Sequence, residues 1–413
     1  MIDVATSYVP LLHPADARAA AECVREAAAE GTRLRVRGRG RWLDAGRPVV
    51  AEAGIATDRL VGVVEYTPGD LTLTALAGTP LDAIERATRA ERQWLPLDPF
   101  GAPDGSIGAT IATASAGPLA HAFGLARDNV LGVEFVTGTG DVVRGGGRVV
   151  KNVAGFDLVR LLTGSWGTLG VITEVTVRLR SLPEADVTVA LPLPPEAAAA
   201  RALVGGVVAA QRTTLAPVAL ELVSAPLATR LGLAAGGAHA LLARLAGNAD
   251  LVAAQRAALA ALGDVAEAPA GAWSALRAME PPVAAVVRLS HLPSLLFEVW
   301  RHALAAVEGM PGALVHASVG RGVARCVVPS PDAERLAAAF AAGHFAVGGA
   351  PGTQIFERLP APLWPRLSPS AMGRDPGAAR LSRRVKVAFD PQGVLNPGIL
   401  GETAGGPAVE AGG

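Results

Sequence analysis

The chain has 413 residues and half of them are hydrophobic, so it is long enough for two or three domains with sizeable cores. Lys plus Arg and Asp plus Glu number 37 each, which argues against nucleic-acid binding, because such proteins normally carry a basic excess. The two cysteines, Cys23 and Cys326, are far apart and form no CxxC pair. A disulfide framework or a cysteine-bound cluster inside this chain is therefore not expected.

The N-terminal residues lack the basic-then-apolar order of a signal peptide. No window offers the roughly 18 uninterrupted apolar residues that a membrane span requires. The best candidate, residues 197–210, is short and contains Arg201. We therefore predict a cytoplasmic protein without a membrane span.

The N-terminal half of the sequence predicts alternating short helices and strands. An alanine-rich helix opens at His13–Pro14 and ends at Gly31, because proline favours the first turn of a helix and glycine the position after the last. Leu34–Gly38 is predicted as a short strand that runs into a glycine turn. Leu60–Gly78 holds two strands around a Pro-Gly-Asp turn, and Thr79–Pro80 is expected to cap the next helix.

Two further strand patterns follow. Val130–Gly146 is predicted as a hairpin whose turn, Thr137–Gly140, carries the glycine that a positive φ requires. Val171–Leu182 alternates apolar and polar residues over a long strand. Four prolines, at positions 183, 192, 194 and 195, then mark a domain boundary.

The second half predicts alanine-rich helices mixed with strands, such as residues 284–290 and 324–330. Leu381–Leu400 is expected to form a helix followed by a tight turn. The last residues, 401–413, are predicted to be disordered because they are rich in glycine and poor in large apolar side chains.

Common enzyme motifs are absent from the sequence. It contains no GxGxxG fingerprint, no Gly-Lys pair of a phosphate-binding loop and no HExxH zinc motif. The nearest approach to a nucleophile elbow, His316–Gly320, lacks the first glycine. The seven histidines are scattered without metal-ligand spacing, so no metal site is predicted.

Three glycine-rich loops remain to be explained: Val36–Arg41, Pro103–Gly117 and Lys151–Gly170. Small residues let main-chain N–H groups approach a ligand closely, and successive N–H groups form a nest for an anion such as a pyrophosphate. For any one loop alone, a tight connection in a crowded domain is the simpler interpretation. The three together favour a large, flat cofactor pressed against main chain.

Four segments carry a resemblance to a known family: "SIGATIATASAG", "RDNVLGVEFVTGTGDVVRGGG", "KNVAGFDLVRLLTGSWGTLGVITEV" and the terminal "FDPQGVLNPG". In this order they resemble FAD-linked oxidases of the vanillyl-alcohol oxidase and p-cresol methylhydroxylase (PCMH) type. The third segment is similar to the E subunits of bacterial glycolate oxidase, one branch of that family. The resemblance is strong over residues 10–185, weaker through the middle, and returns near residues 380–400.

The resemblance implies an α+β fold, in which a PCMH-type FAD-binding domain with two subdomains precedes a C-terminal α+β cap domain. The expected FAD-binding domain spans residues 1–183 and the cap domain residues 184–380. Residues 381–400 would return to the FAD-binding domain, and residues 401–413 would form the tail.

The resemblance also implies a non-covalent FAD site. Lys151 and Asp157 would brace the third loop, and Asn396 would come back near the flavin ring. The cofactor-binding residues expected in this way are Arg37, Gly38, Arg39, Gly40, Arg41, Ser106, Ile107, Gly108, Thr110, Gly167, Thr168, Gly170, Val171, Ile172 and Asn396.

Some positions depart from the family pattern. Arg39 and Arg41 interrupt the first loop, which is usually Arg-Gly-Gly-Gly, and Ala109 replaces a second glycine. Arg39 could add charge to the phosphate contact or could lack room where a positive φ is needed. No histidine or cysteine lies in the first loop. His121 is the nearest candidate for covalent flavin attachment, and an ordinary loop histidine is the simpler interpretation.

The catalytic candidates lie in the second half. Catalytic subunits of this oxidase type carry a His-Gly-Asp-Gly-Asn-x-His motif, and here only His316 remains, so a Lewis-acid metal is not expected. His316 is a candidate base, with a structural histidine as the default interpretation. Arg288 and Arg321, and also Arg325, could bind a carboxylate or could be surface charges on strands.

We therefore expect an FAD-dependent oxidoreductase that acts on the CH–OH group of a small 2-hydroxy acid. The resemblance implies a subunit that partners a catalytic FAD subunit and an iron–sulfur subunit, since this chain has too few cysteines for its own cluster. Two alternatives stay open. One is a non-catalytic assembly subunit with the same fold, and the other is a stand-alone oxidase or dehydrogenase for another substrate.

Overall fold

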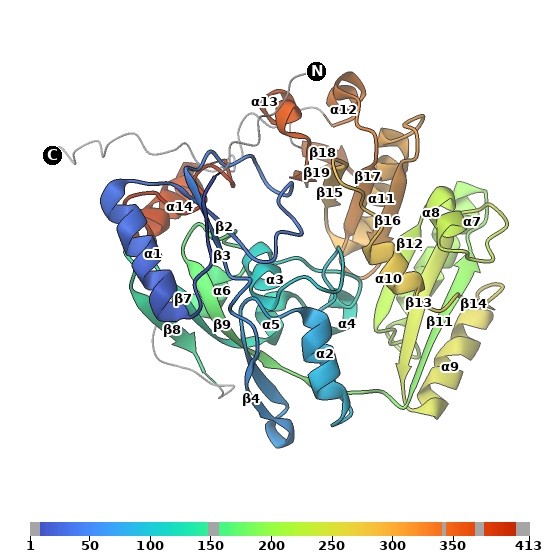
Figure 1. Ribbon diagram of the computed structural model, residues 1–413. Helices are drawn as coiled ribbons and strands as arrows, with labels where there is room; N and C mark the ends of the chain where they lie inside the picture. The colour runs from blue at the N-terminus through green and yellow to red at the C-terminus, as the bar shows by residue number, and fades with distance from the viewer. Residues whose placement is uncertain (1–8, 148–156, 341–343, 368–375, 402–413) are drawn as a thin grey trace.

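The computed structural model describes residues 9–147, 157–340, 344–367 and 376–401. These residues form two units that lie side by side (Figure 1). The described parts of residues 9–182 and 376–401 make the first unit, and those of residues 183–367 make the second. Lys151 and almost all of the predicted tail lie outside the described residues, and the predicted domain boundaries stay a prediction.

The first unit is built around two sheets. Its strands are β1 (Leu11–Leu12), β2 (Leu34–Arg37), β3 (Ala53–Ala56), β4 (Val63–Thr67), β5 (Thr72–Leu76), β6 (Gln93–Trp94), β7 (Val130–Val136), β8 (Val142–Gly146), β9 (Val171–Arg178) and β10 (Arg180–Ser181). Its helices are α1 (Ala17–Glu30), α2 (Leu81–Arg89), α3 (Ile107–Thr113), α4 (Ala120–Phe123), α5 (Ala126–Asn129), α6 (Leu158–Leu162) and α14 (Pro376–Phe389). A small parallel sheet has the order β1-β3-β2, and an antiparallel sheet has the order β4-β5-β9-β7-β8.

Helix α1 confirms the first predicted helix. Asp16 caps its start by accepting a hydrogen bond from the Ala19 N–H (2.7 Å), and Gly31 ends it with a φ of 70°. Its buried face, which includes Val24, packs with Ile55 of the small sheet. The helix therefore covers the sheet from which the first glycine loop departs.

The capping prediction for α2 was wrong in one respect. Pro80, not Thr79, occupies the N-cap position, and no side chain caps this helix. The Thr79 hydroxyl instead contacts the main chain of Gly62, to which it donates at 3.1 Å and from which it accepts at 3.0 Å. Thr79 therefore joins the helix start to the segment before β4.

The five-stranded sheet confirms the predicted hairpins. Strands β4 and β5 flank the Pro68–Asp70 turn, and β7 pairs with β8 across the predicted Thr137–Gly140 turn. Ile107 and Ile111 of α3 pack on this sheet in one buried cluster. This packing fixes the start of α3 close to the end of β2.

The second unit is a nine-stranded sheet with helices on it. Its strands are β11 (Ala185–Pro192), β12 (Ala219–Val223), β13 (Ala240–Gly247), β14 (Ala266–Glu267), β15 (Ala285–Ser290), β16 (Leu314–Ser318), β17 (Val323–Val328), β18 (His344–Val347) and β19 (Ala350–Arg358). Its helices are α7 (Ala197–Ala210), α8 (Ala225–Arg230), α9 (Ala249–Ala260), α10 (Ala272–Arg277), α11 (Leu296–Ala306), α12 (Ala333–Ala339) and α13 (Trp364–Leu367). The strand order is β14-β11-β13-β12-β16-β17-β15-β19-β18, and all neighbours are antiparallel.

The two faces of this sheet carry different kinds of side chain. One face packs apolar residues such as Leu222 and Val287 against Trp300 of α11. The other face carries His316, which lies directly opposite Arg325, which in turn lies opposite Arg288 on the next strand. Directly opposed residues of neighbouring strands share a face. A row of polar side chains therefore crosses β16, β17 and β15 on one face.

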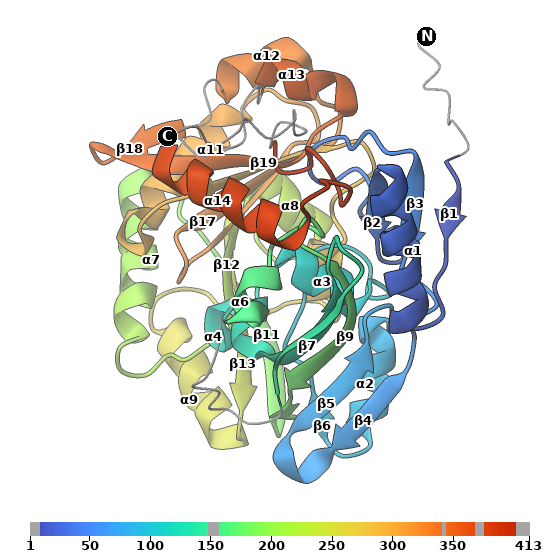
Figure 2. The ribbon, with the colours of Figure 1, turned by 90° about the vertical axis from the view of Figure 1, so that its left-hand side faces the viewer.

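The C-terminal segment returns to the first unit, where α14 lies beside β7 and α6 (Figure 2). The Leu34 N–H donates to the Val394 carbonyl (2.7 Å), and the Asn396 N–H donates to the Leu34 carbonyl (3.0 Å). Lys386 Nζ bonds to the carbonyls of Thr168 and Leu395. These bonds fix the last turn beside the end of β2.

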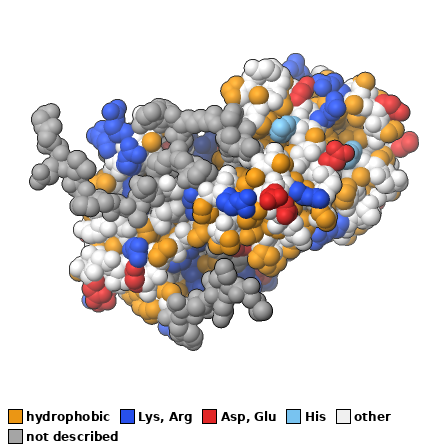
Figure 3. All heavy atoms as spheres, turned by 90° about the horizontal axis from the view of Figure 1, so that it is seen from above, with side chains coloured by type: hydrophobic (Ala, Val, Ile, Leu, Met, Phe, Trp, Pro, Cys, Tyr) orange, Lys and Arg blue, Asp and Glu red, His pale blue; other side chains and the backbone are white. Residues whose placement is uncertain are grey.

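The surface reflects the balanced charge of the chain. In Figure 3 the visible Lys and Arg side chains are interspersed with Asp and Glu side chains. Among the described residues, no helix is both long enough and apolar enough to cross a membrane.

Candidate active site

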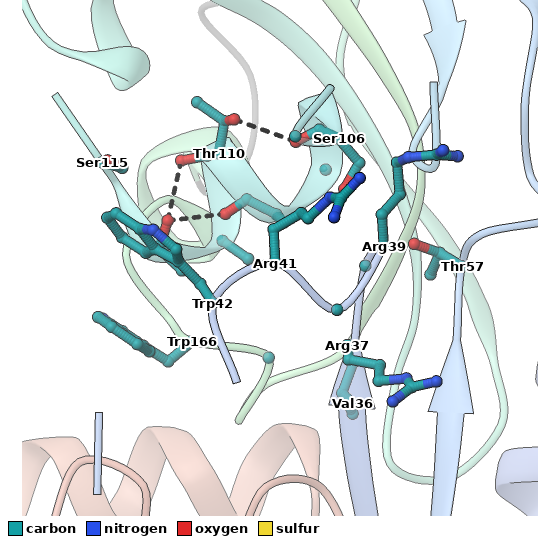
Figure 4. Close-up of a pocket in the computed structure, with 18 of the residues that line it drawn as sticks. Val36, Arg37, Arg39, Arg41, Trp42, Thr57, Ser106, Thr110, Ser115 and Trp166 are labelled. Atoms are coloured by element: carbon teal, nitrogen blue, oxygen red, sulfur yellow. Dashed lines mark hydrogen bonds between the residues drawn. The ribbon is translucent and has the colours of Figure 1, made fainter. Parts of the chain in front are cut away.

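A narrow cleft, here called the loop cleft, opens where the first glycine loop meets helix α3 (Figure 4). The loop of residues 38–43 forms one wall, the start of α3 the second, and residues 166–172 the third. All three predicted glycine-rich loops contribute to it. The cleft therefore brings together segments that are more than one hundred residues apart in the sequence.

Glycines make this close approach possible. A Cβ on Gly38 would lie 2.4 Å from Ser106 Oγ and 3.0 Å from the Ala109 Cβ, so the loop main chain rests directly on the start of α3. Gly167 has a φ of 69°, and a Cβ there would lie 3.0 Å from Asn396 Nδ2. Larger residues at either position would push the walls of the cleft apart.

The cleft offers unpaired polar groups to a ligand. Among the described residues, the main-chain N–H groups of Gly38–Arg41 make no hydrogen bond. The hydroxyls of Ser106 and Ser115 are buried and have no partner in the part of the chain that the structure describes. Buried polar groups normally find partners, and a loop of free N–H groups suits a phosphate. These features fit the pyrophosphate and polar edge of a dinucleotide cofactor.

Four arginines, Arg35, Arg37, Arg39 and Arg41, line the cleft at the first loop, and Figure 4 labels the last three. Arg41 forms an ion pair with Asp104, which ties the loop to the segment before α3, and Arg39 is exposed. Arg35 and Arg37 are half-buried on β2, and Arg37 Nη1 lies 3.9 Å from the position of a Cβ on Gly40. Burial lowers the pKa of Arg35 to about 10. Neither Arg35 nor Arg37 forms an ion pair with a described acidic residue.

The position of Arg39 bears on the alternatives left open for it. Arg39 is not among the residues with a positive φ, whereas Gly40 takes that conformation with a φ of 75°. The Arg39 side chain points away from Trp42 and Trp166 (Figure 4). Arg39 therefore neither fills the cleft nor strains the loop.

Asn396 joins two walls of the cleft. Its Oδ1 accepts from the Val36 N–H (2.8 Å), and its Nδ2 donates to the carbonyls of Val36 (3.2 Å) and Trp166 (2.7 Å). The side chain is buried, and its amide is occupied by main-chain groups of the protein. Asn396 therefore lines the cleft and joins its walls, and its expected place near the flavin ring stays a prediction.

Most of the predicted cofactor residues line the loop cleft: Arg37, Gly38, Arg39, Gly40, Arg41, Ser106, Gly108, Thr110, Gly167, Gly170, Ile172 and Asn396. Ile107, Thr168 and Val171 do not. Ile107 and Val171 point into the two cores of the first unit, because neighbouring positions on a helix or strand face different sides. The Thr168 hydroxyl is buried and donates to the Ser165 carbonyl (2.7 Å). Asp157 caps α6 by accepting from the Arg160 N–H (3.0 Å).

A second, larger cavity, here called the sheet cavity, adjoins the loop cleft. It has a volume of about 1470 Å³ and lies against the polar row of the nine-stranded sheet. Residues that line both spaces are Trp42, Phe100, Thr113, Ser115, Trp166 and Ile399. A ligand that fills the loop cleft would therefore reach the edge of the sheet cavity.

All three predicted catalytic residues, His316, Arg288 and Arg321, line the sheet cavity. His316 Nδ1 lies 2.7 Å from Glu221 Oε2, and both side chains are at most 4% exposed. Because a carboxylate can only accept, Nδ1 carries the hydrogen. Nε2 is buried and has no partner among the described residues. The pair therefore places the second ring nitrogen, Nε2, at the cavity without a partner among the described residues.

The arginines of the cavity differ in their partners. Arg325 is bound by Glu280 and Glu357, each at 2.5 Å, and Arg288 Nε lies 2.9 Å from Glu357 Oε1. Arg321 lies in the turn after β16 and forms no ion pair with a described acidic residue. Its burial lowers its pKa. Arg325 is thus neutralised within the protein, whereas Arg321 is available to an anionic ligand.

The charged network extends to the first unit. Arg358 pairs with Glu280 (3.3 Å) and with Asp44, which directly follows the first glycine loop. The Gly46 N–H also donates to the Glu357 carbonyl (3.0 Å). The network therefore ties the loop cleft to the sheet cavity.

Sequence reasoning missed several of these residues. Glu221 lies in the apolar strand "ALELV", where a single carboxylate is a signal of a buried partner, but its partner is 95 residues away. Trp42 and Phe100 lie in loops without a recognisable motif. His121 lies outside both cavities and packs against Gly320. No cluster of potential metal ligands occurs among the described residues.

Comparison with known proteins agrees with this geometry. Residues 10–146 match a family model described as FAD binding domain. The chain is 39% identical over 170 residues to glycolate oxidase subunit GlcE of Escherichia coli, a match that covers 40% of this chain and 48% of that protein. It is 38% identical over 165 residues to glycolate oxidase subunit GlcD of Bacillus subtilis, covering 40% and 34%. The chain thus matches less than half the length of either relative.

The fold is shared more widely. The structure of p-cresol methylhydroxylase with substrate bound superposes with a TM-score of 0.71 at 16% identity, covering 95% of this chain and 88% of that one. Likeness at this identity shows the fold alone, and it confirms the predicted α+β architecture of the PCMH type. The chain therefore has the PCMH-type fold, its residues 10–146 match the FAD binding domain family, and FAD is the cofactor to which that match points.

Proposed function

We propose that this chain binds FAD non-covalently in the loop cleft and oxidises a small 2-hydroxy acid to a 2-oxo acid in the sheet cavity. The observation that carries the proposal is the Glu221–His316 pair, whose free Nε2 lies on a cavity that shares six lining residues with the loop cleft. The two similar glycolate oxidase subunits support this substrate class.

Each polar side chain of the sheet cavity has its own role in this proposed reaction. The hydride that leaves the substrate α-carbon, with its two electrons, would be taken up by the bound FAD. His316 Nε2 accepts the proton of the substrate hydroxyl, and Glu221 stabilises the imidazolium that results. Arg321 binds the substrate carboxylate, since Arg288 and Arg325, which line the same sheet cavity, are already paired with Glu357. Arg288 makes a weaker contact with the same carboxylate, because its ion pair with Glu357 partly neutralises its charge.

The cofactor is expected to lie against main chain. The free N–H groups of Gly38–Arg41 bind the pyrophosphate, and Ser106 and Ser115 offer hydroxyls along the cleft. Three residues predicted to bind the cofactor, Ile107, Thr168 and Val171, are left out of this site because their side chains face the interior.

The same comparison suggests partners. We propose that the chain assembles with a catalytic FAD subunit and an iron–sulfur subunit of a glycolate oxidase-type complex. Its own two cysteines cannot hold an iron–sulfur cluster, so electrons would leave through a partner. A cytoplasmic location is part of the same proposal.

Turnover assays test the proposal. The purified chain is assayed with glycolate and with D-lactate and a dye as electron acceptor, alone and with its partner subunits, and its flavin content is measured by absorbance. The proposal predicts bound flavin and turnover that is lost in His316→Gln. A flavin-free chain that still joins the complex would favour the non-catalytic assembly subunit. A flavin-loaded chain that oxidises only other substrates would favour a stand-alone enzyme.

A further inference from the structure

Phe100 lines both the loop cleft and the sheet cavity. It lies on the loop between β6 and α3 of the first unit, yet it is only 7% exposed and packs with Val223, Val286 and Val327 of the nine-stranded sheet. The next residue, Gly101, donates its N–H to the Arg277 carbonyl (2.9 Å). A loop of the first unit is therefore fixed inside the polar face of the second.

The Phe100 ring contacts the polar row itself. The guanidinium carbon of Arg325 lies 3.6 Å from the centre of the ring, which is a close cation–π contact. The His316 ring lies 5.3 Å from the same centre, at an interplanar angle of 49°. Arg325 cannot shift, because Glu280 and Glu357 hold it. Phe100 is thus held on the Arg325 side and limits the space of the His316 ring.

The Glu221 bond alone does not fix the imidazole. The ring is held at Cβ by its covalent bond and at Nδ1 by the hydrogen bond, so it can still tilt about the axis through these two points, and a tilt would move Nε2 within the cavity. We propose that Phe100 positions His316: its ring supplies the second constraint and keeps water from the Glu221–His316 bond. This positioning role rests on the proposed function of His316 as the base.

A spectroscopic readout tests the role without turnover. The flavin-loaded full chain carries labelled histidine, and NMR follows the Nδ1–H proton of His316, assigned by its absence in His316→Gln. In Phe100→Leu this proton is predicted to exchange with water about tenfold faster or more, since the bond loses its cover. The matched control is Phe297→Leu, because Phe297 is 8% exposed and stacks with Arg201 on the helix-covered face.

Kinetics separate positioning from substrate binding. Phe100→Leu is predicted to lower kcat by about tenfold to a hundredfold with little change in KM, because a small misplacement of a catalytic group affects the reaction and not the binding step. If Phe100→Leu fails to fold, Phe100→Met keeps the volume without the ring and is measured in the same way. Exchange as slow as in the wild type would overturn the proposal. If the chain oxidises no 2-hydroxy acid, the exchange rate still decides the role of Phe100.

Discussion

Glu221 and His316 are 95 residues apart in the sequence and form a buried 2.7 Å hydrogen bond on the polar face of the nine-stranded sheet. The bond exists because β12 pairs with β16 and places Val223 directly opposite His316. Glu221 lies two residues before Val223 and therefore on the same face of the sheet. The hydrogen bond fixes the tautomer of His316. The acid–base chemistry proposed for the chain follows from this single contact.

The first prediction concerns the charge of Glu221. Glu221→Gln keeps a side-chain oxygen that can accept from Nδ1 but loses the negative charge that stabilises the imidazolium. The kcat for 2-hydroxy acid oxidation should fall by about a hundredfold, which is within the usual range for general base catalysis. Flavin content measured by absorbance should not change. Glu267→Gln, which breaks an exposed ion pair with Arg256 in the same sheet, is the control and should leave kcat unaltered.

The second prediction concerns the three hydrogen bonds by which Asn396 joins two walls of the loop cleft. Asn396→Ala removes three hydrogen bonds to Val36 and Trp166 and leaves their main-chain groups unpaired. Each unpaired buried group costs about 1–3 kcal/mol, so FAD affinity should fall at least tenfold. Asn248→Ala removes a helix cap in the second unit and should cost about 1 kcal/mol of stability without changing FAD affinity. Equal FAD affinity in Asn396→Ala and the wild type would show that these hydrogen bonds do not maintain the shape of the cleft.

The third prediction separates the arginines of the first loop. Arg37 is half-buried beneath the loop without an acidic partner, whereas Arg39 is exposed. Arg37→Gln should weaken FAD binding by about tenfold, a typical value for one charge-assisted contact, and should reduce its salt dependence. Arg39→Gln should have less than about a twofold effect, because exposed charges are screened. Fluorescence titration at two salt concentrations measures both, and a larger loss in Arg39→Gln would contradict the assignment.

The fourth prediction concerns the pH dependence of stability. Both carboxyl oxygens of Asp98 lie within hydrogen-bond distance of the Leu119 N–H, at 3.1 and 3.2 Å, and burial of the carboxyl raises its pKa from the usual 3.8 to about 7. Between these two values the folded state binds more protons at Asp98 than the unfolded state does. The contribution of Asp98 to the free energy of unfolding therefore falls as pH rises from about 4 to about 7.

Asp98→Asn removes this titration while keeping an oxygen for the Leu119 N–H. The free energy of unfolding of the variant, relative to the wild type, should rise with pH across that window, by less than about 1.4 kcal/mol per pH unit. Urea denaturation at several pH values measures the difference. Asp250→Asn, at an exposed position in the first turn of α9, is the control. A difference that is independent of pH would contradict the proposed titration of Asp98.

Local signals in the sequence predicted much of the first unit. Gly31 at the end of α1, the Pro-Gly-Asp turn before β5 and the glycine turn of the β7–β8 hairpin each act over a few residues, and the structure confirms them. The predicted start of α1 at His13–Pro14 was wrong, because Asp16 caps the helix and Ala17 is its first residue. The resemblance carried the order of the glycine loops, and the loops do meet in one cleft. The side chains of Ile107, Thr168 and Val171 face inward, which a motif does not show, and their expected contact with the cofactor stays a prediction.

The sheet cavity was less predictable, because its contacts join distant strands. Arg288, Arg321 and His316 were candidates from the sequence, yet only the register of β16, β17 and β15 places His316 and Arg288 on one face, and Arg321 lines the same cavity from the turn after β16. Glu221 and Phe100 were missed, since neither a single glutamate in an apolar strand nor a phenylalanine in a loop shows which distant residue it contacts. Their roles depend on pairing across 95 residues and on a contact between two units.

The most direct test of the account is an anaerobic single-turnover measurement on the purified chain alone. Glycolate or D-lactate is mixed with the flavin-loaded chain, and the flavin absorbance is followed over time beside that of His316→Gln. The account predicts bleaching of the flavin band in the wild type and none, or bleaching at least about a hundredfold slower, in the variant. Equal bleaching in both, or none with either acid in a chain that holds flavin, would contradict the proposal that His316 acts as the base in this cavity.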